Sequence, residues 1–239
     1  MGNEIMDSPM SYKPDRPGRH VVIVNGGPPP SPRIAGVLAP ADIVLGVDGG
    51  YAHAELLSLR CDELIGDFDS LDEALLAQAK ARGVTVSRFD VDKDATDLEL
   101  ALMRAHDLKA DSITVVCGEG WGDRFDHLAA QLGLLANPFF ADISVRAWYG
   151  EAFVAAVHDG GSATLFGIRG QMISLLAVGA DVTGVQTSGL RFPLDHETLS
   201  PYSTRSVSNE FHTTSATIRV GRGSLLVIVP DALSNASQR

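Results

Sequence analysis

The stretch Glu63-Leu64-Ile65-Gly66-Asp67-Phe68-Asp69-Ser70-Leu71-Asp72-Glu73 (residues 63–73) combines three patterns that decide the fold. It opens with a short apolar run typical of a buried strand, and two alternate aspartates, Asp67 and Asp69, follow directly. Ser70 and Glu73 then form a capping box, in which the two side chains satisfy free backbone N–H groups at the start of a helix. The stretch therefore predicts a strand, an acidic turn and a helix in immediate succession.

The same order of strand, polar turn and helix recurs through the first 150 residues. Strands are expected at 21–24, 43–47, 63–65, 84–86, 113–117 and 143–147. Helices are expected from the first capping box to Gly83, from a second capping box at Thr96 to about Leu108, and from near Asp126 to just before Asn137. This alternation predicts an α/β fold over residues 20–150, with a mostly parallel sheet and flanking helices.

The pattern changes after about residue 150, where helical periodicity is absent. Short Thr- and Val-rich runs, separated by Gly-containing turns, occupy 182–185, 216–220 and 225–229. These runs predict a small antiparallel β-sandwich domain over residues 151–239. Residues 1–19 are polar and contain proline, and we expect a disordered tail there.

Composition excludes several classes of protein. The 239-residue chain has no apolar run near the roughly 20 residues that cross a bilayer, so we expect no membrane protein. Its net charge of −11 disfavours general binding to nucleic acid. Cys61 and Cys117 show no metal-type spacing and are expected to be buried thiols in a cytoplasmic protein. A disulfide between them is the alternative. Residues 42–126 hold 19 of the 30 acids and 8 of the 19 basic residues, so the negative charge is localised.

Each acidic motif follows a predicted strand. Because the loops after parallel strands emerge at one edge of a sheet, motifs that are far apart in sequence should meet there. Crowded carboxylates need a cation, and the oxygen ligands of Asp67, Asp69 and Asp97 suit Mg²⁺, which is usually shared with substrate phosphates. The alternative is that these acids cap helices or lie in solvated turns, and Asp97 at the first turn of its helix fits that as well.

The Gly-rich segment 118–127 leads from a predicted strand into a helix. Such turns expose backbone N–H groups that can bind phosphate, here with help from Arg124. The segment is not a dinucleotide-binding fingerprint, because Asp123 stands where a third glycine would be required. His127 is the one histidine within a motif, and it can equally be a structural residue.

Four of these motifs, in this order, resemble those of the thiamine pyrophosphokinase family. They are Asp48-Gly49-Gly50, Gly66–Ser70, Asp92–Asp97 and Gly118–His127. Sequence landmarks of that family's β-sandwich domain follow at 173–176, 187–194, 208–210 and 223–228. The resemblance covers about residues 21–230. It implies an enzyme that transfers the pyrophosphoryl group of ATP to the hydroxyl group of thiamine and releases AMP.

The resemblance also implies roles for individual residues. Asp67, Asp69 and Asp97 would be the catalytic acids that hold Mg²⁺. The nucleotide would be contacted by Asp48, Gly49, Gly118, Gly120, Gly122, Arg124, Asp126 and His127. The substrates would be contacted by Lys93, Asp94, Thr96, Ser208 and Asn209, the last two approaching thiamine. Members of the family work as homodimers, with thiamine held where the two chains meet.

The chain departs from the family pattern at two positions. Asp123 stands where the family often has glycine before the motif arginine, and Gln131 stands where it often has asparagine. An acid beside Arg124 would repel phosphate unless it pairs with that arginine. Both departures concern the nucleotide contacts rather than the metal site.

Two other functions remain open on sequence grounds. The first is a phosphatase of the haloacid dehalogenase type, because Asp67 and Asp69 follow a strand as that family's acidic pair does. Leu71, however, stands where that family usually has threonine or valine. The second is a non-catalytic sensor of nucleotide or thiamine, which would not need a complete set of metal-binding acids.

Overall fold

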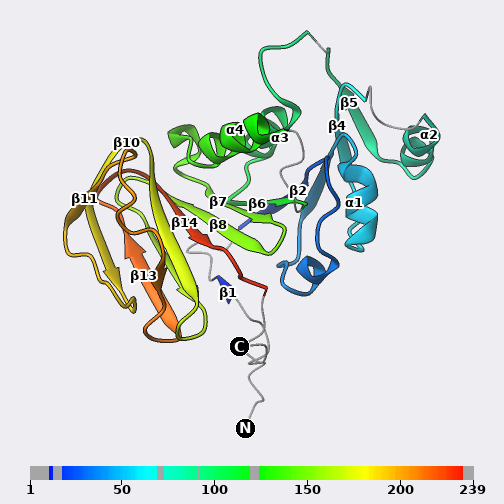
Figure 1. Ribbon diagram of the computed structural model, residues 1–239. Coiled ribbons are helices and arrows are strands. Elements are labelled where there is room, and N and C mark those ends of the chain that lie inside the picture. The colour runs from blue at the N-terminus through cyan, green and yellow to red at the C-terminus, as the bar shows by residue number, and fades with distance from the viewer. Residues whose placement is uncertain (1–10, 13–17, 69–72, 91, 119–123, 234–239) are drawn as a thin grey trace.

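The computed structural model describes residues 11–12, 18–68, 73–90, 92–118 and 124–233 (Figure 1). Most of the tail predicted at 1–19 lies outside these residues, as do Ser70 of the first capping box and the predicted site residues Asp69, Gly120 and Gly122. Within the described part of the tail, Ser11–Tyr12 (β1) pairs with a strand of the C-terminal half.

The first half of the chain forms a parallel sheet in the order β7-β6-β2-β3-β4-β5. Its strands are His20–Val24 (β2), Ile43–Val47 (β3), Glu63–Gly66 (β4), Thr85–Arg88 (β5), Ser112–Cys117 (β6) and Ser144–Tyr149 (β7). All six strands predicted in this half are confirmed. Residues of the central strand β2 are buried on both faces, and this explains its continuous apolar pattern.

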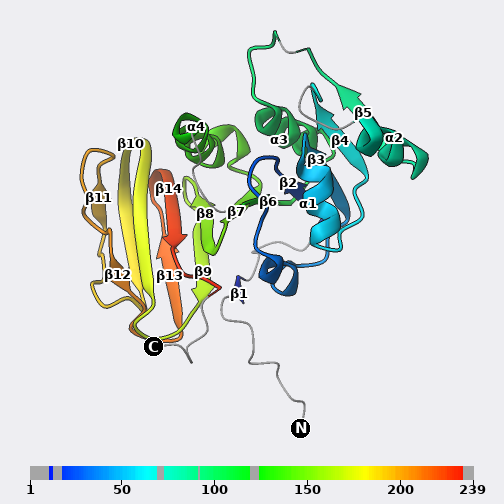
Figure 2. The same cartoon turned by 45° about the vertical axis from the view of Figure 1, so that its right-hand side comes forward.

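Helices cover both faces of this sheet (Figure 2). They are Gly50–Leu56 (α1), Glu73–Ala81 (α2), Asp97–Asp107 (α3) and Phe125–Leu135 (α4), with 3-10 turns at Pro32–Gly36 (η1) and Pro138–Phe140 (η2). Val21 and Ile23 of β2 share a core with α3 and α4, whereas Val22 and Val24 share one with α1 and α2. The three predicted helices are confirmed, and the Thr96 hydroxyl caps α3 by accepting from the Glu99 amide.

Helix α1 was not predicted, because its sequence opens with the glycines of the Asp48-Gly49-Gly50 motif. The structure shows why a glycine begins this helix. A Cβ at Gly50 would lie 2.0 Å from the carbonyl oxygen of Val24, so only glycine lets α1 approach strand β2 this closely. None of the helices in the described residues has the length and apolar character needed to span a membrane.

The second half is antiparallel and extends the same sheet. Its strands are Ala152–Val157 (β8), Ser162–Phe166 (β9), Met172–Ser188 (β10), Glu197–Leu199 (β11), Asn209–Glu210 (β12), Ser215–Arg219 (β13) and Arg222–Val229 (β14). Strand β8 pairs with β7, β14 with β8, and β10 with β14, so hydrogen bonding is continuous across residue 150.

Strand β10 joins two antiparallel arrays. Its first half pairs with β14 and its second half with β13, with a register shift between Val178 and Thr183. Gly179 and Gly184 have positive φ angles of 76° and 66°, which allow the chain to turn at this shift. The arrays share one apolar core, and the arrangement fits the predicted β-sandwich. Cys61 and Cys117 are both buried free thiols, as predicted.

Candidate active site

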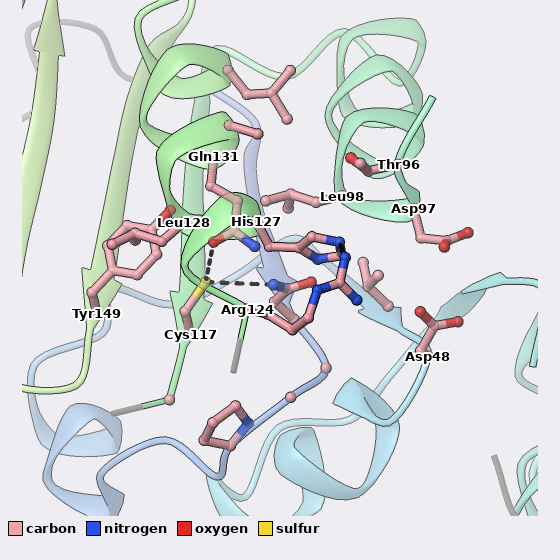
Figure 3. A pocket seen from close by; sticks show the side chains of 18 of the residues that line it. Asp48, Thr96, Asp97, Leu98, Cys117, Arg124, His127, Leu128, Gln131 and Tyr149 are labelled. Carbon is pink, nitrogen blue, oxygen red and sulfur yellow. Dashed lines mark hydrogen bonds between the residues drawn. The ribbon is translucent and has the colours of Figure 1, made fainter. Parts of the chain in front are cut away.

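A cavity of about 870 Å³ lies at the carboxyl ends of β2, β3, β6 and β7, beside the first turns of α3 and α4 (Figure 3). The predicted site residues that line it are Asp48, Gly49, Lys93, Thr96, Asp97, Gly118, Arg124 and His127. Loops after parallel strands therefore meet at one edge, as the sequence predicted. Asp94 and Asp126 are exposed and lie outside the lining, and Asp67 does not belong to the lining either.

Lys93 links two of the predicted metal-binding acids. Its Nζ atom lies 3.4 Å from Oδ2 of Asp67, which follows β4, and 3.2 Å from Oδ1 of Asp97 in the first turn of α3. The three side chains are only 15–16% exposed. Burial alone would lower the pKa of Lys93, but the carboxylates of Asp97 and Asp67 outweigh it and the pKa is raised. The fold thus brings two acids, 30 positions apart in sequence, to one shared cation.

Asp48 lies beside the end of β4. Its amide donates to the Ile65 carbonyl over 3.0 Å, and its backbone has a positive φ of 48°. A Cβ at Gly66 would lie 1.9 Å from Oδ1 of Asp48, so the glycine makes room for this carboxylate. Among the described residues, no three His, Cys, Asp or Glu side chains converge as a complete metal site, and Asp69 lies outside those residues.

Arg124 is held at the start of α4 by two neighbours. Its Nε and Nη2 atoms each donate to the carboxylate of Asp126 over 3.1 Å, and Nη2 also contacts Nε2 of His127. The hydrogen bonds from Arg124 lower the pKa of the exposed Asp126. Since the guanidinium can only donate, Nε2 of His127 accepts. Arg124 and His127 lie side by side in the cavity, on the side of Asp97 and Asp48 (Figure 3).

The other end of the cavity is built around Cys117. Its Sγ atom lies 3.7 Å from Nδ2 of Asn25 and 3.9 Å from Oε1 of Gln131 (Figure 3). Burial raises the pKa of Cys117 to about 12 and that of Tyr149 well above its usual range, so both groups stay protonated. Asn25 and Tyr149 were not among the predicted site residues, and the one sequence signal for each is its place at the end of a strand.

Ser208 and Asn209 do not reach this cavity within one chain. Asn209 is buried, and its amide side chain bonds to backbone atoms of Phe192 and Glu210. Ser208 is exposed, with a positive φ of 60°. Strand β12, next to these residues, lies far from β4 and β5 in Figure 2.

The matches that follow place this chain, with its acidic sheet edge and appended antiparallel half, in the class of ATP-dependent diphosphokinases. Residues 35–147 match the model for the thiamin pyrophosphokinase catalytic domain, and residues 164–225 match that for its vitamin B1 binding domain. The chain belongs to the thiamine pyrophosphokinase family.

Similar proteins extend over almost the whole chain. Thiamine pyrophosphokinase from Bacillus subtilis is 26% identical over 207 residues, which cover 86% of this chain and 96% of the relative. A crystal structure of the B. subtilis protein has a TM-score of 0.75 at 25% identity, covering 88% of this chain and 98% of the other. The structure from Geobacillus thermodenitrificans has a TM-score of 0.73 at 26% identity, covering 91% and 99%.

Proposed function

We propose that the chain transfers the diphosphoryl group of ATP to the hydroxyl group of thiamine, with Mg²⁺ held by Asp67, Asp69 and Asp97. Family membership makes the chain an ATP-dependent diphosphokinase with thiamine and ATP as substrates. It also argues against the two alternatives, the dehalogenase-type phosphatase and the non-catalytic sensor.

The observation that carries the proposal is the contact of Lys93 with both Asp67 and Asp97. Two largely buried carboxylates at one edge repel each other unless a cation lies between them. Their oxygens are the hard ligands that Mg²⁺ prefers, and Asp69, two positions after Asp67, would add a third carboxylate. When bound, Mg²⁺ would neutralise charge on the phosphoryl oxygens of ATP.

Two of the described residues that line the cavity, Lys93 and Arg124, have positively charged side chains. Both would contact the phosphate chain, Lys93 near the two acids and Arg124 from the start of α4. Asp126 holds the Arg124 guanidinium through two hydrogen bonds and so restricts its orientation. The turn that begins at Gly118 would add backbone N–H groups. A Cβ at Gly118 would lie 1.9 Å from the Pro28 carbonyl oxygen, so glycine is required where this turn begins.

The transfer needs positioned reactants more than a protein nucleophile. A bond forms between the hydroxyl oxygen of thiamine and the β-phosphorus of ATP. The bond between that phosphorus and the oxygen bridging the α- and β-phosphorus atoms breaks, and AMP leaves with this oxygen. The hydroxyl proton is released, and thiamine diphosphate is the second product.

We further propose a homodimer in which thiamine lies between the chains. The region around Ser208 belongs to the part of the chain that matches the vitamin B1 binding domain, yet it lies far from the acidic edge of its own chain. A second copy could bring the two together. Tyr202 is 96% exposed and Phe192 is 59% exposed, and both supply apolar surface in the part of the chain around Ser208 for such an interface.

Product analysis tests the proposed reaction. The protein is incubated with ATP, Mg²⁺ and thiamine, and the phosphorus-containing products are separated and identified. Thiamine diphosphate and AMP should appear in equal amounts. Formation of ADP, or a lack of turnover, would contradict the proposal, and a phosphoenzyme trapped on Asp67 would favour a phosphatase. Sedimentation should give a mass of two 25.3 kDa chains, and a monomer at working concentration would contradict the dimer.

A further inference from the structure

Phe68, which follows Asp67 at the end of β4, has a backbone conformation that is rare for a large side chain. Its φ angle is 62°, in the left-handed region where the Cβ atom crowds the backbone. A bulky residue stays in this region only where the surrounding structure holds it there, and such residues gather at functional sites. Phe68 precedes no helix cap or hairpin turn in the described residues, so its conformation needs another explanation.

Burial of the aromatic ring is what holds Phe68 in this conformation. The residue is only 5% exposed, and it belongs to the apolar core on the side of the sheet covered by α1 and α2. That core also contains Tyr51 of α1, Leu64 of β4 and Ala79 of α2. A return to an extended conformation would turn the ring away from these neighbours, so the apolar contacts offset the backbone strain.

The space for the ring is provided by Gly66. A Cβ at Gly66 would lie 3.4 Å from Cε1 of Phe68 and 1.9 Å from Oδ1 of Asp48, so the ring and this carboxylate both lie against the glycine. Arg88 of β5 pairs with Gly66, and its guanidinium carbon lies 5.7 Å from the centre of the Phe68 ring. This distance is that of a cation–π contact. The ends of β3, β4 and β5 therefore enclose the ring.

Phe68 and Asp67 are directed to different helices. The ring packs in the core of α1 and α2, whereas the Asp67 carboxylate contacts Lys93, which also contacts Asp97 in the first turn of α3. Helix α3 packs in the other core of the sheet. Because the two residues are consecutive, a rotation of the backbone at Phe68 would also move Asp67. The buried ring thus fixes where the Asp67 carboxylate lies.

We propose that Phe68 is a positioning residue for the diphosphoryl transfer, an inference that rests on the proposed function. Its buried ring holds the turn after β4 in the conformation that places Asp67 beside Lys93 and Asp97. Phe68 is not among the described residues that line the cavity, so it acts through Asp67. Groups that orient metal-binding side chains typically change metal affinity or activity by about 10- to 100-fold when they are replaced.

Phe68→Gly tests this role, because glycine adopts the left-handed conformation freely and removes only the ring. Metal binding is measured with Mn²⁺ as the probe, from the electron paramagnetic resonance signal of the free ion and without thiamine. The Kd for Mn²⁺ should rise about tenfold. In the thiamine diphosphate assay, the Mg²⁺ concentration that gives half of the maximal rate should rise by a similar factor. The KM for thiamine should stay within about twofold.

A pair of leucine variants separates positioning from a purely structural role. Phe68→Leu keeps part of the apolar anchor, and the Kd for Mn²⁺ should rise by about threefold, less than in Phe68→Gly. Phe140→Leu makes the same change at a similarly buried ring, in η2 and outside the cavity lining. Both leucine variants should lower the melting temperature, but Phe140→Leu should leave the Kd for Mn²⁺ unchanged. This pair decides the matter if Phe68→Gly does not fold.

Two results would overturn the inference. They are an unchanged Kd for Mn²⁺ in folded Phe68→Gly, and equal changes of that Kd in Phe68→Leu and Phe140→Leu. Failure of the proposed function is distinguishable, because Mn²⁺ binding does not require turnover. A wild-type protein that makes no thiamine diphosphate but loses Mn²⁺ affinity through Phe68→Gly would leave the positioning of Asp67 standing and remove the reaction. A wild-type protein that binds no Mn²⁺ would contradict both.

Discussion

Arg104 donates a 2.9 Å hydrogen bond from Nε to the carboxylate of Glu63, and this ion pair joins helix α3 to strand β4. Asp97 begins that helix and Asp67 follows that strand, so the pair connects the two elements that carry the acids around Lys93. The Glu63 side chain is only 9% exposed and also accepts from Ser87 of β5 over 2.7 Å.

Arg104→Met should therefore reduce both stability and catalysis. The change leaves a buried carboxylate with one hydrogen-bond partner fewer, and should lower the free energy of unfolding by about 1–3 kcal/mol. Urea denaturation measures this loss. Because Asp97 and Asp67 are then less firmly placed, kcat should fall while the KM for thiamine changes little. Arg60→Met, at an exposed arginine, is the control, and equal stability of the two variants would contradict the role of the ion pair.

Asp97→Asn should remove most of the activity without unfolding the protein. Asparagine still fits the first turn of α3, but the site loses one of the two charges that contact Lys93. We expect kcat/KM to fall by about 100-fold or more, as for other groups that stabilise charge in a transition state. Asp107→Asn, the same change at the exposed end of α3, should be nearly silent. Normal turnover by Asp97→Asn at saturating Mg²⁺ would remove Asp97 from the metal site.

Replacement of either of two glycines on different helices by alanine should change the stability of the protein, in opposite directions for the two positions. A Cβ at Gly50 would meet the Val24 carbonyl oxygen at 2.0 Å, so α1 must shift and Gly50→Ala should destabilise the protein by about 1–3 kcal/mol. Gly133 in α4 has open space around the added Cβ, so Gly133→Ala should stabilise by about 0.5–1 kcal/mol. Melting temperatures and urea midpoints measure both. Similar effects of the two changes would show that the close contact does not matter.

Two buried histidines should make the protein less stable as the solution becomes acidic. Burial lowers the pKa of His20, and Arg146 adds to this against the hydrogen bond to the Pro40 carbonyl. Burial also lowers the pKa of His158. The unfolded chain, with histidine pKa values near 6.5, then binds more protons than the folded chain just below that pH. The contribution of these two histidines to stability is therefore fully present above pH 6.5. It is lost as the pH falls through 6.5 towards the lowered pKa values of the folded protein.

Urea denaturation at about pH 7.5, 6.5 and 5.5 measures this dependence, in a range where most carboxylates stay ionised. The free energy of unfolding should decrease from the first value to the last. His20→Gln removes one of the titrating groups, so the decrease should be smaller in that variant. A wild-type free energy that stays constant or rises towards low pH would contradict the assignment of two buried neutral histidines.

Much of the catalytic half could be predicted because its patterns are local. Strand periodicity, the Thr96 capping box and the helix ending before Asn137 are each decided by neighbouring residues, and each is confirmed. Helix α1 was missed, because a glycine in sequence is typical of a turn. Only the close contact of Gly50 with strand β2 explains why this glycine begins a helix. The long strand β10 was recognised only at 182–185, because its pairing partners change along its length.

The sequence by itself determined that acids gather at one edge of an α/β sheet, because parallel strands send every following loop to the same side. Tertiary structure decided which side chains meet there. The contacts of Lys93 with Asp67 and Asp97 depend on distances between separate elements, and so does the grouping of Asn25, Cys117 and Gln131. Such contacts arise from packing between distant segments, on which no local sequence pattern carries information.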